Sequence, residues 1–128
     1  MRINTHLKIN QRLCGIPTVI EEGFAQVELV PTADMSADDV GLIHGGFIFG
    51  LADYAAMLAV NDPHVVLGGA VVKFLKPVAV DEPVTAEARV VETQGRKHVV
   101  HVSVKKTAVT VFDGQFTCFV LDKHVLST

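Results

Sequence analysis

The stretch 45–60 limits the folds open to this chain of 128 residues more than any other part of it. Its single charged side chain is Asp53, and the rest is Phe, Ile, Leu, Ala, Met, Val, Gly and one Tyr. A run that is apolar on all sides and rich in Ala and Leu predicts a helix buried over most of its circumference. Two glycines open the run and Asn61-Asp62-Pro63 closes it, as expected of a helix end. The run is shorter than a bilayer span and carries a carboxylate near its middle, which argues against a membrane helix.

Asp53 is the one charged residue of this apolar helix, and its presence there needs an explanation. A carboxylate in such a setting is costly unless it is paired, hydrogen-bonded or neutralised. Burial would also raise its pKa, as is common for catalytic acids and bases. Two interpretations therefore stand: Asp53 caps or pairs with a neighbouring element, or it is a functional carboxylate.

The start of the helix, His44-Gly45-Gly46, favours the second interpretation. Free backbone N–H groups at a helix N-terminus suit an anion or a polarised carbonyl oxygen, and glycine leaves room for a ligand. Asp53 lies eight residues after Gly45, about 12 Å along the helix axis. One substrate carbonyl cannot contact both groups on the same helix. If they act together, two antiparallel helices must bring the N–H from one chain and the acid from a second, which predicts a two-fold dimer.

Composition excludes several other functions. The length predicts one domain over residues 1–128, and the net charge of −3 gives no reason to expect nucleic acid or a membrane surface as partner. Cys14 and Cys118 are too few and too far apart for a disulfide framework, and the histidines lack metal-ligand spacing. We therefore expect no metal, no cofactor and no signal peptide, and a cytoplasmic protein with reduced thiols.

The remaining elements follow from periodicity and turn residues. We expect a short helix over residues 4–13, and a loop over 31–43, a length more typical of functional loops. Strands are expected at residues 18–21, 24–30, 64–75, 83–92 and 97–105, and in a last run through residue 120. Gly68-Gly69 predicts a bulge or a close approach of two backbones. Asp113-Gly114 interrupts no alternation, so we expect the last strand to continue through it with Gly114 as a bulge or flat point. The order predicts an α+β fold in which an antiparallel sheet wraps around one long central helix.

His44-Gly45-Gly46, followed by Phe49 and Leu51-Ala52-Asp53, resembles the motif of the hotdog-fold acyl-CoA thioesterases, most closely the phenylacetate-pathway type. The resemblance covers residues 37–121. It implies a dimer or a dimer of dimers that hydrolyses a coenzyme A thioester.

The resemblance also implies roles for individual residues. Asp53 would be the general base or nucleophile, Gly45 the oxyanion donor with Gly46 as second choice, and His44 a supporting residue. An asparagine commonly lies six positions before the motif's histidine in this family and helps to hold the attacking water. Asp38 takes that place here. It either accepts a hydrogen bond from that water or is simply a solvated acid of the loop.

The substrate-binding residues are the least specific part of the prediction. Phe47 and Tyr54 are candidates to line the acyl tunnel from the second subunit, and Lys73 and Arg96 to bind the phosphates of coenzyme A. Lys76 and Lys97 border the same groove, although each of these four cations taken singly is better explained as a solvated charge at the sheet edge.

Two other functions compete with the thioesterase. The chain from Phe49 onward also resembles the ligand domain of malonyl-CoA-sensing lipid regulators, which would make it a binding module without chemistry. Those regulators carry asparagine where this chain has Asp53 and arginine where it has His44, and they need a DNA-binding segment. A dehydratase of the same fold would need a histidine inside the central helix, where this sequence has none.

Overall fold

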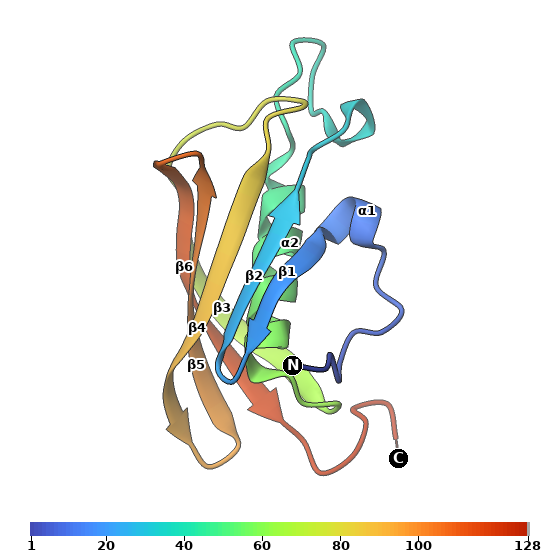
Figure 1. Ribbon diagram of the computed structural model, residues 1–128, viewed down its shortest axis with the longest axis vertical. Coiled ribbons are helices and arrows are strands. Elements are labelled where there is room, and N and C mark those ends of the chain that lie inside the picture. The colour runs from blue at the N-terminus through green and yellow to red at the C-terminus, as the bar shows by residue number, and fades with distance from the viewer. Residues whose placement is uncertain (128) are drawn as a thin grey trace.

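Six strands form one antiparallel sheet that curves around a single long helix in the structure, a computed structural model that describes residues 1–127 (Figure 1). The strand order is β1-β2-β4-β5-β6-β3, so β1 and β3 are the two edges. The predicted α+β arrangement is confirmed. The elements are α1 (Gln11–Cys14), β1 (Ile16–Glu21), β2 (Phe24–Leu29), a 3-10 turn η1 (Ala33–Met35), α2 (Gly45–Val60), β3 (Val65–Phe74), β4 (Val84–Gln94), β5 (Lys97–Lys106) and β6 (Val109–Val120).

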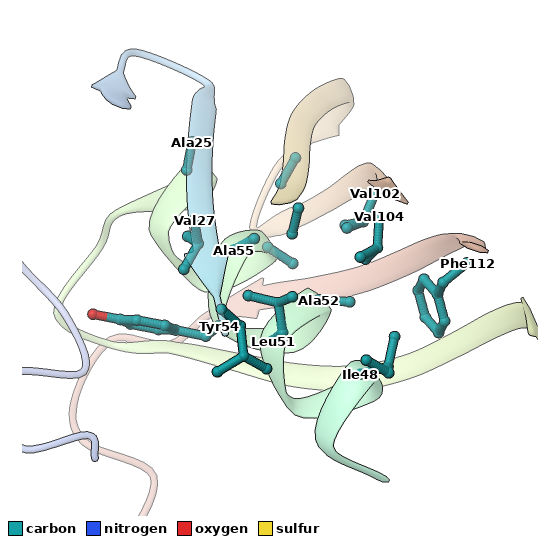
Figure 2. Close-up of a cluster of buried hydrophobic side chains, with 14 of the residues drawn as sticks. Ala25, Val27, Ile48, Leu51, Ala52, Tyr54, Ala55, Val102, Val104 and Phe112 are labelled. Atoms are coloured by element: carbon teal, nitrogen blue, oxygen red, sulfur yellow. The ribbon is translucent and has the colours of Figure 1, made fainter. Parts of the chain in front are cut away.

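The core lies between α2 and the concave face of the sheet. The helix contacts all six strands, and Leu51, Ala52 and Ala55 point from it toward them, fully buried (Figure 2). Alternate residues of the strands, such as Val102 and Val104, complete this layer because successive side chains of a strand point to opposite faces. Small alanines let the helix sit close to the sheet. No helix within residues 1–127 has both the length and the apolar character to cross a membrane.

The predicted strands and their irregularities agree with the structure. The pairing of β3 with β6 shifts register between Leu67 and Gly69, at the predicted bulge. Strand β6 runs without interruption through Gly114, which pairs regularly with Val72 and with Val102. Gly114 is therefore a flat point and not a bulge. A Cβ there would lie 2.6 Å from Cγ1 of Val72, so the close approach of the strands needs glycine.

The predicted helix over residues 4–13 is wrong, because only Gln11–Cys14 is helical. The side chain of Asn10 accepts hydrogen bonds from the N–H groups of Arg12 and Leu13 and so starts the helix there. The segment before it is held in an irregular path by Asn61 at the end of α2. Its Oδ1 accepts the N–H of Asn4, and its Nδ2 donates to the carbonyl of Arg2, both at 2.8 Å.

Candidate active site at the start of the central helix

Two backbone hydrogen bonds fix the point at which α2 begins. Ile43 donates its N–H to the carbonyl of Val78 at 2.9 Å, and His44 donates to the carbonyl of Met35 at 3.0 Å. His44 is extended and is the residue that precedes the helix, so Gly45 is its first helical residue. No acceptor within residues 1–127 takes the N–H of Gly45, which leaves this donor free for a ligand.

Aromatic rings cover both glycines at the helix start. The Phe74 ring lies over Gly45, where a Cβ would be 3.2 Å from Cε1 of that ring. The His44 ring lies over Gly46, where a Cβ would be 3.0 Å from Nε2. His44 also packs edge-on against Phe47, with ring centroids 6.2 Å apart. Glycine at both positions therefore permits close contacts that alanine would strain.

A cavity of about 330 Å³ opens beside Gly45. Ile48 of α2, Phe74 at the end of β3 and Val111 of β6 form its walls, and Lys76 is its one charged lining residue. Phe74 is 56% exposed although it packs edge-on against the buried Phe112. The free N–H of Gly45 thus borders an apolar hollow that is open to solvent, a setting typical of small-molecule sites.

Asp53 lies two turns further along α2, and the structure gives it no stabilising partner. Its Oδ1 is buried and has no hydrogen-bond partner among the described residues, and none of the ion pairs there includes it. Burial raises the pKa of Asp53 from 3.8 to about 6. The interpretation of Asp53 as a cap or a salt-bridge partner within its own chain is therefore wrong. An unpaired acid with a raised pKa is typical of an active site.

Both cysteines lie near Asp53. Burial raises the pKa of the Cys118 thiol to about 12, and the Asp53 carboxylate adds to the effect. The pKa of Cys14 is raised by the same two causes in the same order. Since a nucleophilic cysteine needs a lowered pKa, neither thiol is suited to attack a substrate. Of these three groups, only Asp53 has a pKa near neutrality.

Asp38 serves the loop before the helix. Its Oδ1 accepts the backbone N–H groups of Val40, Gly41 and Leu42 at 3.0 to 3.1 Å. The hydrogen bonds from Leu42 and Val40 contribute most to the lowered pKa of Asp38. Asp38 is therefore an ionised residue that shapes the loop with one of its two oxygens.

The other predicted binding residues are spread over the molecule. Tyr54 is buried and points away from the sheet toward the N-terminal segment, where His6 lies 6.2 Å from it between ring centroids (Figure 2). Lys73 is exposed on the edge strand β3, opposite Asp113. Arg96 pairs with Asp122 at the β4–β5 turn, which lies at the other end of the molecule from the start of α2 (Figure 1). Within one chain, only His44, Gly45, Gly46 and Phe47 are brought together.

Sequence reasoning gave no site role to Phe74, and it left Lys76 out of the predicted binding residues. Phe74 ends β3 and reaches α2 only because the sheet curves, which no local pattern indicates. The signal that was available is the position of both residues around the end of β3, next to the connection that returns the chain to β4.

An antiparallel sheet wrapped around one long helix defines a hotdog fold, and the start of that helix carries the free N–H of Gly45. The comparison with known families agrees, since the model of the thioesterase superfamily matches residues 40–111, more than half of the chain. The chain belongs to the thioesterase superfamily.

Two curated relatives are longer proteins. The methylthioribose-1-phosphate isomerase of Aquifex aeolicus (strain VF5) is 54% identical over 123 residues, which are 95% of this chain and 27% of that protein. Transcription factor FapR of Caldanaerobacter subterraneus is 30% identical over 96 residues, 75% of this chain and 48% of that protein. The chain thus spans about a quarter and about half of these relatives.

Two solved structures match nearly the whole fold. The uncharacterized protein PH1136 from Pyrococcus horikoshii has 50% identity and a TM-score of 0.98, with 99% of this chain and 98% of that one covered. The PaaI protein from the phenylacetic acid degradation operon of E. coli has 26% identity and a TM-score of 0.80, with 88% and 83% covered. The similarities to PaaI and FapR agree with both resemblances drawn from the sequence.

Proposed function

We propose that this protein hydrolyses an acyl-CoA thioester to the free acid and coenzyme A. The observation that carries the proposal is the unpaired, buried Oδ1 of Asp53, whose pKa of about 6 leaves a carboxylate at neutral pH. The N–H of Gly45 would polarise the thioester carbonyl and stabilise the oxyanion that forms on it. Asp53 would either remove a proton from the attacking water or attack the carbonyl itself.

The two groups belong to one site only if two chains share it. Gly45 and Asp53 are about 12 Å apart along α2, so one carbonyl reaches Gly45 of one chain and Asp53 of a second. A two-fold axis between them passes close to Phe49 and Gly50, midway along that interval. A Cβ on Gly50 would meet nothing within 4 Å in its own chain, although glycine in a helix costs about 1 kcal/mol relative to alanine. Close approach of a second helix would explain why glycine occupies position 50.

The edge strand β3 offers the rest of the interface. It borders β6 on one side only, so its other side carries unpaired backbone groups. Val71 is 77% exposed and Gly69 and Ala70 beside it are exposed as well. Pairing of two β3 strands would satisfy these groups and bring the exposed sides of two α2 helices together. We propose this dimer as the active unit. We also propose that the protein is cytoplasmic, because both of its cysteines are free thiols.

An acyl-CoA-binding module without chemistry is the second candidate, favoured by the similarity to FapR. It would use the same helix start and the same cavity, but it would not need a carboxylate at position 53.

The decisive experiment measures release of free thiol from a panel of acyl-CoAs by the wild type and by Asp53→Asn. The enzyme proposal expects turnover with at least one thioester and a loss of at least about a hundredfold in kcat in the variant. Ser103→Ala, a change on the sheet far along the chain from the site, is the control and should keep full activity. Saturable binding of acyl-CoA by both proteins without turnover would instead favour the binding module.

A further inference from the structure

Three segments far apart in the sequence meet at the C-terminal end of α2. They are the N-terminal residues that Asn61 holds, the connection from α2 to β3, and the chain after β6. Both termini lie at this end of the molecule (Figure 1). Leu121 donates its N–H to the carbonyl of His64, which attaches the last segment to the connection.

A cavity of about 250 Å³ lies between these segments, separate from the cavity at Gly45. His6, His64 and His124 line it, one from each segment, together with Thr5. These are three of the six histidines of the chain. Thr5 is the buried polar residue of the described chain, only 5% exposed. We call this site the three-histidine cavity.

The hydrogen bonds around the cavity leave one ring nitrogen free on two of the histidines. Nδ1 of His6 is 2.8 Å from the hydroxyl of Thr5. Nδ1 of His124 accepts the N–H of Leu126 at 3.0 Å, which places the proton of the neutral ring on Nε2. His64 uses only its backbone, since its N–H donates to Asp62 and its carbonyl accepts from Leu121. Its ring is bound by no group among residues 1–127.

The cavity lining carries no fixed charge that would repel an anion, and its polar groups are imidazoles and a hydroxyl. The lining residues include no Asp, Glu, Lys or Arg. Asp62, next to the lining, has its Oδ1 engaged by the N–H of His64. Burial lowers the pKa of His6, so its ring is neutral at neutral pH and an anion beside it would favour the proton. A metal is not favoured, because within residues 1–127 no three of these ligand types are arranged to hold one.

We propose that the three-histidine cavity binds a phosphate group, either free phosphate or the phosphate ester of a larger ligand. Nε2–H of His124 and the imidazoles of His6 and His64 donate to its oxygens, since imidazole N–H groups bind anionic oxygen strongly. The inference does not depend on the thioesterase proposal, because the cavity lies at the opposite end of α2 from Gly45.

The six histidines allow the test to carry its own controls. The imidazole resonances of the full chain are followed by NMR at pH 6.5 during titration with sodium phosphate at constant ionic strength. We expect His6, His64 and His124 to shift together along one saturable curve. His98 and His101, on the sheet, should not move. Parallel arms with coenzyme A and with dephospho-coenzyme A distinguish an ester phosphate from the free ion.

Substitution then assigns the site. His64→Gln keeps the backbone bonds of that residue and should weaken phosphate binding about tenfold. His124→Gln, at an exposed position, is a second variant with the same expectation, and His98→Gln should bind like the wild type. The proposal is overturned if phosphate shifts none of the three histidines, or if all six shift in parallel.

Discussion

Replacing Asp53 by Asn should make the protein more stable, although it removes the proposed catalytic group. The folded state holds the proton of Asp53 up to about pH 6, whereas the unfolded chain releases it near the ordinary value of 3.8. This difference corresponds to about 3 kcal/mol of destabilisation, at most, once both states are ionised. The penalty is absent below about pH 4, grows between pH 4 and 6, and is complete above that range. Asp53→Asn should therefore raise the free energy of unfolding by up to about 3 kcal/mol at pH 8 and by almost nothing at pH 4.

The assay is urea unfolding at both pH values, at one protomer concentration because association would couple to stability. Asp38→Asn is the matched control, since that carboxylate accepts three backbone N–H groups and its pKa is lowered. Its stabilising effect is present at pH 8 and is lost as the pH falls through its folded pKa, so the variant should be less stable at pH 8. The reasoning fails if Asp53→Asn is no more stable than the wild type at pH 8, or if its gain persists unchanged at pH 4.

Three further predictions follow from the same geometry. Because the carboxylate form of Asp53 is required, kcat/KM measured against pH should fall as the pH drops below about 6, and a profile flat from pH 5 to 8 would contradict this role. Gly50→Arg should give a folded protein that is monomeric by light scattering and inactive in the thioester assay. Val91→Arg, at a site 53% exposed on β4, should remain dimeric. A Gly50→Arg dimer with full activity would exclude the shared site. Leu51→Ala, at a fully buried position, should cost about 2–5 kcal/mol in urea unfolding, whereas Leu126→Ala, at a position 81% exposed, should change it little; equal effects would refute the assignment of the core.

The sequence was sufficient for α2 and for the strands because their signals are local. Uninterrupted apolar residues, strand alternation and glycine positions each act over a few neighbours. The N-terminal helix was wrongly predicted because Asn61, 57 residues away from Asn4, decides the path of that segment. The local periodicity on which that prediction was based does not reveal a hydrogen bond to so distant a residue.

The candidate site was predictable where the motif is contiguous and not where the fold assembles it. His44, Gly45, Gly46 and Asp53 all lie on one helix or beside it, so spacing alone related them. Phe74 and the cavity walls come from β3 and β6, which approach the helix start only through the curvature of the sheet. Lys73 and Arg96 were predicted to bind the ligand only from their positions along the strands. Arg96 is instead paired with Asp122.

The location of the two chain ends has a practical consequence. Both chain ends lie at the end of the molecule where α2 finishes, whereas the proposed site opens at Gly45, where the same helix begins (Figure 1). An affinity tag or a reporter domain fused at either terminus would therefore extend away from the cavity at Gly45. The same arrangement suits incorporation of this fold into a longer polypeptide, as the match to 27% of the Aquifex aeolicus isomerase illustrates.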